Sequence, residues 1–186
     1  MTVSPDPPGS PGAGAPDPAG SPGSDAPGPP GSPHRNVLAV REAARRLGVE
    51  LETREFPAGT RTAEDAARAI GVQVGQIVKS LVFAVDGSPV MALVSGANQL
   101  DERLLAAAAG GQRASRVDAD TVRAATGFPV GGVPPFGHDL AVYVDRDLLA
   151  YPVVWAAAGT PRDNFAIAPA DLVRASSGTV CELRRT

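Results

Sequence analysis

The chain has 186 residues, which is enough for one domain with a hydrophobic core. It carries 17 Lys and Arg against 20 Asp and Glu, with one Cys and two His. These numbers exclude a disulfide framework, leave no convincing metal cluster and argue against a protein that binds many phosphates at once. No apolar stretch approaches the length of a membrane span, and a lone cysteine suits a reducing compartment, so we expect a cytoplasmic protein.

The first 33 residues differ in composition from the rest. They contain eleven of the 19 prolines and seven of the 21 glycines, and no aromatic or basic residue. Such a segment cannot bury enough apolar surface to offset its ordering entropy, and it lacks the apolar core of a signal peptide. We therefore predict a disordered tail over residues 1–34 and one folded domain over residues 35–186. That domain is formally neutral, which still allows a small site for one nucleic-acid end.

Short helices and strands are expected from residue 36 onward. Apolar residues at helical spacing from Val37 predict a helix that stops at Gly48, and residues 50–56 have the pattern of a short strand closed by a proline. Thr62 lies three residues before an acidic side chain, which is a capping-box arrangement, and the helix that it opens should end at Gly71.

A hairpin and three further segments make up the middle of the chain. Strands are predicted over residues 77–85 and 89–95, and the Asp-Gly pair between them is a strong hairpin signal. Residues 100–111 have acids in the first turn and glycines at the end, as a helix should. A short strand near 114–117 and a helix near 119–126 follow.

The last third combines strands with one helix that opens at Pro169. Its strands are predicted over residues 140–145, 153–158, 164–168 and 179–184. Because strands and helices follow one another without regular βαβ repetition, the order favours an α+β domain. We expect a curved mixed or antiparallel sheet with short helices packed outside.

Lys79 is the only lysine of the chain, and all other basic residues are arginine. On alternating strand geometry it shares a face with Leu81 and Phe83, where an unpaired cation costs desolvation. One interpretation is a lysine whose stem lies on apolar surface while its head reaches water. The other is a functional ammonium, a compact point charge that a planar guanidinium cannot replace.

Residues 131–137, "GGVPPFG", form the second unusual segment. Glycines allow positive φ and close approach of a ligand to the backbone, and two prolines stiffen the chain. Rigid backbone N–H groups bind a carbonyl or a developing oxyanion. The alternative is a plain turn between a helix and a strand.

The segment "GQIVKSLVF" followed by "GFPVGGVPPFGHD" resembles the YbaK/aminoacyl-tRNA synthetase-associated domain family. This family contains free-standing aminoacyl-tRNA deacylases and the editing insertion of prolyl-tRNA synthetases. The resemblance covers about residues 36–184, since "TAEDAARAIGV", "PVMALVSG", "YVDRDL" and "PADLVR" also occur in family order. It implies a YbaK-like fold and a hydrolase that acts in trans on misacylated tRNA.

The resemblance also implies site residues. Lys79 matches the pocket lysine that positions the aminoacylated terminal adenosine, and the Gly-x-x-x-Pro loop of the family falls on Gly131 and Pro135. Lys79 and Gly131 are therefore the expected catalytic residues, with the terminal ribose hydroxyl helping to activate water. No metal or organic cofactor is implied. The expected substrate-binding residues are Gly132, Val133, Pro135, Phe136, Gly137, His138 and Gly159.

Several questions stay open at this level. His138 suits a general base or a cap for the next strand, and Ser80 should point away from the pocket unless the strand is bulged. Asp139 and Asp145 could pair with Arg146 or Lys79, but we take them as solvated surface acids. Gly159 is followed by Thr-Pro rather than by the basic residues of relatives that act on cysteinyl-tRNA, so the edited amino acid is undetermined.

The expected partner is the acceptor end of misacylated tRNA, with an aminoacyl-tRNA synthetase as a further candidate and no membrane; the oligomeric state is open. One rival function is a non-catalytic module that binds tRNA 3′ ends or aminoacyl-nucleotides. A second rival is a Schiff-base enzyme with Lys79 as nucleophile.

Overall fold

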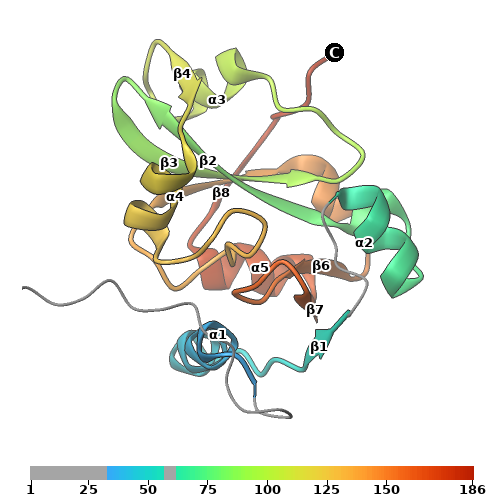
Figure 1. The fold of residues 1–186 in the computed structure, drawn as a ribbon. Coiled ribbons are helices and arrows are strands. Elements are labelled where there is room, and N and C mark those ends of the chain that lie inside the picture. Colours follow the sequence, from blue (N-terminus) through green and yellow to red (C-terminus); the bar gives the residue numbers. More distant parts are fainter. Residues whose placement is uncertain (1–32, 57–61) are drawn as a thin grey trace, which may run out of the picture.

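The computed structural model describes residues 33–56 and 62–186, so the predicted tail lies outside the described residues except for its last two positions. Figure 1 shows the elements of the described part. The helices are α1 (Arg35–Arg46), α2 (Ala63–Ile70), α3 (Glu102–Ala108), α4 (Ala119–Thr126) and α5 (Pro169–Ser176), with short 3-10 turns η1 (Val74–Gln76) and η2 (Arg146–Ala150). The strands are β1 (Thr53–Glu55), β2 (Val78–Val85), β3 (Ser88–Ser95), β4 (Ala114–Arg116), β5 (Ala141–Asp145), β6 (Val154–Ala157), β7 (Asp163–Ile167) and β8 (Thr179–Cys181).

The strands form two sheets. The larger has the order β4-β2-β3-β5-β8, in which β2 is antiparallel to β3 and β4 while the β3–β5 and β5–β8 pairs are parallel. The smaller is antiparallel, with the order β1-β7-β6. The α+β prediction is confirmed, but the expected single sheet is divided in two, because β6 meets β2 only at an isolated bridge between Ile77 and Trp155.

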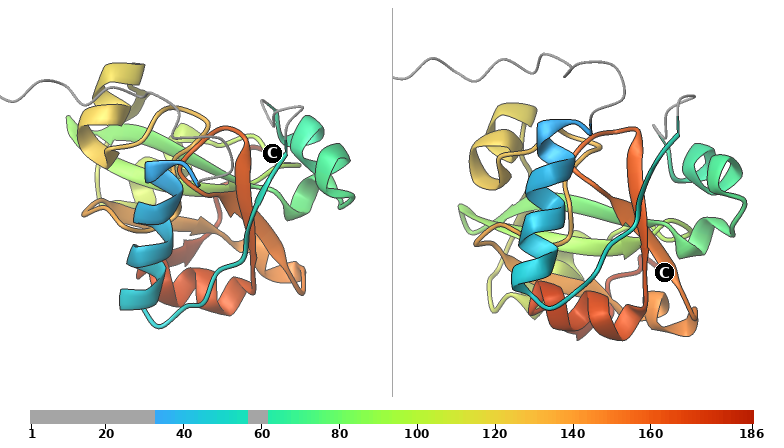
Figure 2. Two further views of the ribbon diagram at one scale, coloured as in Figure 1. Left: turned by 60° about the horizontal axis from the view of Figure 1, so that its bottom comes forward. Right: turned by 90° about the horizontal axis from the view of Figure 1, so that it is seen from below.

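The larger sheet carries a core on each face. Successive residues of β3 alternate between the two cores, so that Met91 and Leu93 face one and Ala92 and Val94 face the other. The first core is closed by α1, α5 and the smaller sheet, which lie on one side of the β2–β3 hairpin (Figure 2), and the second is closed by α3. No helix in the described ranges is long and apolar enough to cross a membrane.

The local signals of the sequence correspond to observed contacts. The Thr62 hydroxyl accepts a hydrogen bond from the N–H of Asp65 at 3.0 Å, and the α2 helix ends at Gly71 with φ +84°. Asp86 and Gly87 have φ values of +50° and +88°, as a two-residue hairpin turn of the primed type requires. The first and last strands are shorter than predicted, because pairing stops at Glu55 and at Cys181.

One edge of β2 is open in its first half. The opposite edge pairs with β3 along its whole length. On the open side, β4 pairs with β2 from Phe83 to Val85, and the bridge to β6 lies at Ile77. No strand of the described part pairs with this edge over residues 78–82. The loop between α4 and β5 passes opposite this gap.

The loop between α4 and β5 rests on the turn after β6. A Cβ on Gly132 would lie 2.8 Å from the Cα of Thr160 and 2.9 Å from the carbonyl carbon of Gly159. Gly159 has φ +96° and lies against the backbone of Asn36, whose side-chain amide donates to the Gly159 carbonyl at 3.0 Å. Helix α1 therefore supports the turn, and the turn supports the loop.

This packing predicts that Gly132→Ala destabilises the protein by about 1–3 kcal/mol, since a backbone neighbour cannot move aside as a flexible side chain can. Urea denaturation measures the free energy of unfolding. Gly71→Ala is the matched control, because φ is +84° there but nothing lies within 4 Å of the added Cβ. The control substitution should lower the free energy of unfolding only by the strain of a left-handed alanine, about 1 kcal/mol. Wild-type stability for Gly132→Ala would show that the loop does not rest on this turn.

Candidate functional site

Two adjoining hollows open at the unpaired edge of β2, with volumes of about 410 and 500 Å³. Both are lined by Lys79, Ser80 and Leu81 of β2 and by Val130, Gly131 and Val133 of the loop. We call the first the small-residue cavity, since its further lining includes Ala63, Ala66, Gly96 and Ala157, with Thr62, Glu64 and Asn164. We call the second the arginine groove, since Arg116 and Arg185 lie on its rim.

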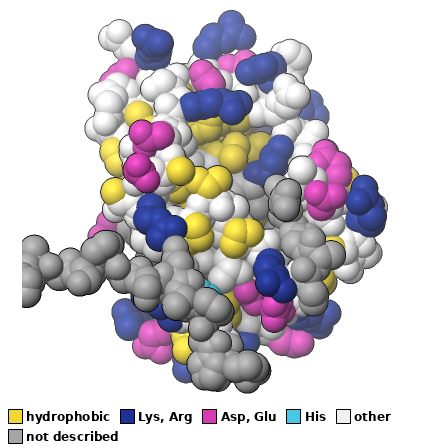
Figure 3. Space-filling view, in the orientation of Figure 1, with side chains coloured by type: hydrophobic (Ala, Val, Ile, Leu, Met, Phe, Trp, Pro, Cys, Tyr) yellow, Lys and Arg dark blue, Asp and Glu magenta, His cyan; other side chains and the backbone are white. Residues whose placement is uncertain are grey.

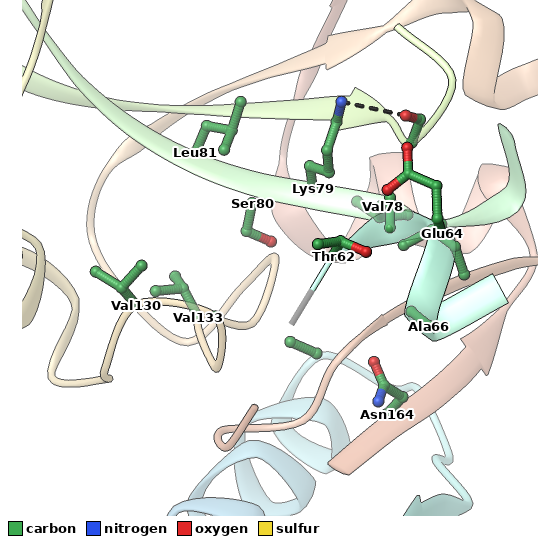
Figure 4. Close-up of a pocket in the computed structure, with 15 residues that line it drawn as sticks. Thr62, Glu64, Ala66, Val78, Lys79, Ser80, Leu81, Val130, Val133 and Asn164 are labelled. Atoms are coloured by element: carbon green, nitrogen blue, oxygen red, sulfur yellow. Dashed lines mark hydrogen bonds between the residues drawn. The ribbon is translucent and has the colours of Figure 1, made fainter. Parts of the chain in front are cut away.

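The ammonium of Lys79 is held by backbone carbonyls. Nζ donates to the carbonyl of Gly96 at 3.3 Å, which is the dashed line in Figure 4. It also donates to the carbonyl of Asn98, in the same turn after β3. Burial lowers the pKa of Lys79, and the nearby charges of Glu64 and Asp145 partly oppose that shift. Because an ammonium has three N–H donors and two are engaged, one donor remains for a ligand.

Asp145 is the group behind this turn. It is fully buried at the end of β5, and its carboxylate accepts from the N–H of Ser95 at 3.1 Å, the side-chain amide of Asn98 at 2.8 Å and the N–H of Asp147 at 3.2 Å. The interpretation of Asp145 as a solvated acid is therefore wrong. Sequence reasoning missed its role because burial depends on the β3–β5 pairing, which joins distant segments.

Ser80 leaves the opposite face of β2 from Lys79, on the side of the strand where Val130 and Val133 of the loop lie (Figure 4). Its register opposite Leu93 continues that of Lys79 opposite Val94, so no bulge is present. Both side chains line the hollows because the edge between them is open. The Ser80 hydroxyl is buried and has no hydrogen-bond partner within the described residues, which makes it available to a ligand or to water.

The loop presents Gly131 at the mouth of both hollows. The N–H of Gly132 donates to the carbonyl of Pro129 at 2.9 Å, and Gly131 has φ +83°, as the third residue of a type II turn requires. The N–H of Gly131 makes no hydrogen bond in the part of the chain that the structure describes. A fixed, unused donor at this place suits a ligand carbonyl.

The other predicted loop residues line neither hollow. Phe136 is buried in the core, where its ring centroid lies 5.7 Å from that of Phe165, and Pro135 is buried beside it. Gly137, with φ +87°, lies against Ala43 of α1. Together with Gly132 and Gly159, these residues hold the loop in place, whereas Gly131 and Val133 reach the hollows.

His138 lies in a different cavity, of about 690 Å³, between α1 and the end of α5. Its Nδ1 accepts from the N–H of Leu140 at 3.4 Å, just before β5, and burial lowers the pKa of its imidazole. This is the strand-capping alternative, and the structure does not bring His138 together with Lys79.

Sequence reasoning did not single out three residues near Lys79. Glu64 and Asn164, from a helix and a distant strand, line the small-residue cavity, and Asn98 lies in the turn that holds the ammonium. The polar run "SGANQ" directly after a buried strand was the one available hint, since polar residues at the end of a buried strand often face a site. Among the described residues, no three His, Cys, Asp or Glu side chains are grouped to hold a metal ion.

Comparisons with known proteins agree with this geometry. The chain is 32% identical over 125 residues to the uncharacterized protein YwhH of Bacillus subtilis, covering 66% of this chain and 80% of that protein. It is 27% identical over 125 residues to the proposed Cys-tRNA(Pro)/Cys-tRNA(Cys) deacylase EbsC of Enterococcus faecalis, covering 66% of this chain and 76% of EbsC. A match to the proline–tRNA ligase of Maridesulfovibrio salexigens, 36% identical over 92 residues, covers 49% of this chain but only 16% of the ligase.

A solved structure, that of a proposed trans-editing enzyme for prolyl tRNA synthetase, superposes with a TM-score of 0.79 at 43% identity. It covers 83% of this chain and 100% of that chain. The model of the aminoacyl-tRNA editing domain matches residues 57–175, well over half of the sequence. The chain therefore belongs to the aminoacyl-tRNA editing domain family.

Proposed function

We propose that this protein is a trans-acting aminoacyl-tRNA deacylase, which hydrolyses the ester of misacylated tRNA and so proofreads translation. Family membership and two relatives named for this activity support the assignment. One observation carries it: at the open edge of β2, the single lysine lines the same hollow as Gly131, whose N–H makes no hydrogen bond within the described residues.

The chemistry needs polar positioning rather than a protein nucleophile. Water adds to the ester carbonyl carbon, the carbon–oxygen bond to the ribose breaks, and the ribose oxygen takes a proton. The products are the free amino acid and a tRNA with a free terminal hydroxyl. During the attack, negative charge develops on the carbonyl oxygen, and we assign the N–H of Gly131 as the donor that receives it. Lys79 offers its third N–H to the ribose or phosphate oxygens of the terminal adenosine.

The Schiff-base rival fits the geometry poorly. A lysine nucleophile needs a neutral amine with a free lone pair. Burial lowers the pKa of Lys79, but the charges of Glu64 and Asp145 oppose that shift, and two carbonyl oxygens accept hydrogen bonds from Nζ. Lys79 is therefore arranged as a cationic donor.

The amino acid side chain is assigned to the small-residue cavity. Ala63, Ala66 and Ala157 leave a space of about 410 Å³ that is shared with the reacting ester. Two amino acids that differ by one methylene differ in binding free energy by only about 1–3 kcal/mol in a hydrophobic pocket. A pocket therefore rejects larger side chains by steric exclusion. Asn164 and Thr62 add polar groups to the wall, which favours a small or hydroxylated amino acid.

The terminal nucleotides are assigned to the arginine groove. Several arginines pair with acids, as Arg68 does with Asp65, whereas Arg116 and Arg185, which line this groove, make no ion pair within the described residues. Figure 3 shows apolar side chains in a hollow with Lys or Arg side chains on its rim, and the groove is lined by Leu81, Phe83 and Val117. Apolar surface for bases beside free guanidinium groups for phosphates suits a single-stranded 3′ end.

The function is tested with tRNAs charged with Ala, Ser, Thr, Cys or Pro. At least one ester should be hydrolysed well above the rate in buffer. Inactivity on all five would contradict the proposal. Tight binding of a non-hydrolysable 3′-aminoacyl adenosine without turnover would instead support the non-catalytic module.

Lys79→Ala and Lys79→Arg should each lower kcat/KM by about 100-fold or more, because misplacing a positioning group is that costly. The alanine variant removes the cation, and the guanidinium of the arginine variant is too wide for the place between two carbonyls. Circular dichroism should show wild-type folding in both. Arg45→Lys, on the exposed face of α1, is the matched control. Near wild-type turnover by Lys79→Arg would refute this explanation of the single lysine.

Arg116→Gln and Arg185→Gln should raise KM for an aminoacylated CCA trinucleotide about 5- to 10-fold and reduce the salt dependence by about one phosphate contact each. Neither change should affect hydrolysis of 3′-aminoacyl adenosine, which has no phosphate. Arg45→Gln is the control for net charge. Equal losses on both substrates would show that these arginines do not bind the nucleotide backbone, without touching the deacylase assignment.

A further inference from the structure

We infer that Asp145 is a positioning residue for the reaction: through Asn98 it fixes the turn whose carbonyls aim the Lys79 ammonium at the hollow. This inference rests on the proposed function for its catalytic consequence. Its structural part concerns only the ammonium and can be tested without any substrate.

The direction of the free N–H on Nζ depends on the two carbonyls. The three donors of an ammonium point to the corners of a tetrahedron, so two fixed acceptors determine where the third donor points. Gly96 and Asn98 supply those acceptors from one short turn. A shift of this turn would therefore re-aim the cation without moving β2.

The beginning of the turn is held by backbone packing. The N–H of Gly96 donates to the carbonyl of Ile77 at 2.7 Å, and the hydroxyl of Ser95 donates to the carbonyl of Gly75 at 2.8 Å. A Cβ on Gly96 would lie 2.2 Å from the carbonyl oxygen of Val74, so η1 fits tightly against this side. At the far end, the N–H of Asn98 donates to the carbonyl of Ser95 at 3.0 Å, which closes the backbone of the turn and leaves the Asn98 side chain to be held by other groups.

The end of the turn is held by two acids, the buried Asp145 and the partly exposed Asp147. The Asn98 amide donates to Asp145 at 2.8 Å and to Asp147 at 2.9 Å, and Arg184 donates to Asp147 at 3.3 Å. Asp145 also accepts from the N–H of Ser95, so it is hydrogen-bonded to the turn both at Ser95 and at Asn98. Its carboxylate oxygens accept three N–H groups in all, which an amide at this position could not do, because one of its two polar atoms is a donor.

The same carboxylate favours the charged form of the lysine. Asp145 and Glu64 are the acids that oppose the effect of burial on the pKa of Lys79. Glu64 lines the small-residue cavity, whereas Asp145 is fully buried behind the turn. A solvent-shielded anion is screened little by salt, so its effect on the ammonium persists at physiological ionic strength.

The single lysine makes the test direct. Lysine labelled with ¹⁵N and ¹³C gives one side-chain signal, which reports the pKa of Lys79 and the exchange of its Nζ protons. The wild type should titrate below the ordinary value of 10.5 with slowly exchanging Nζ protons. Asp145→Asn should lower this pKa further, speed proton exchange and reduce kcat about 10- to 100-fold, with little change in KM. Asp139→Asn, an exposed acid outside both hollows, should change none of these.

The possible outcomes separate the roles. A folded Asp145→Asn protein with the wild-type pKa of Lys79 and wild-type exchange overturns the inference, whether or not activity falls, since Asp145 would then be merely structural. If Asp145→Asn does not fold, the Asn98→Ala variant tests the inference in its place. That variant keeps the Asn98 carbonyl and two of the three donors to Asp145, and it should show the same faster exchange. Unchanged exchange and kcat in Asn98→Ala would overturn the inference. A wild type without deacylase activity would leave the NMR test intact and refute only the proposed function.

Discussion

The Lys79 ammonium at the open edge of β2 is the group on which the site depends. Burial opposes its charge, and two carbonyls with two nearby acids restore part of the lost solvation. A cation that is held mainly by backbone acceptors is not neutralised by a direct ion pair. It can therefore still attract an anionic or polar ligand, which distinguishes it from most arginines of the surface.

The edge of β2 at Lys79 is open because the strands are divided into two sheets. If β4 or β6 continued along β2, the backbone of residues 78–82 would be paired and the hollows would be filled. Instead, the two strands stop at Phe83 and Ile77, and the loop from α4 to β5 covers the gap. Residues from both faces of β2 then reach one space, as Lys79 and Ser80 do. Most loop residues between Gly132 and Gly137 pack against α1 and the core, so that Gly131 is held rigidly at the edge.

Much of this could be predicted from the sequence where the signal is local. The cap at Thr62, the hairpin turn at Asp86-Gly87 and the α+β class follow from patterns within a few residues, and the family follows from short motifs in order. The predictions for Asp145, Ser80 and the single sheet did not match the structure, because each depends on pairing between segments far apart in the chain. His138 adjoins the loop in sequence, yet the chain turns between Gly131 and His138 and leaves the histidine against α1.

A crystal structure with a non-hydrolysable 3′-aminoacylamino adenosine tests the central claim most directly. The amide carbonyl of the analogue should accept from the N–H of Gly131 at about 2.7–3.1 Å, with Lys79 Nζ donating to the ribose while it keeps its two carbonyl partners. The amino acid side chain should occupy the small-residue cavity. An analogue bound beside His138, or one that reaches the hollows without contact to Gly131 and Lys79, would contradict the account.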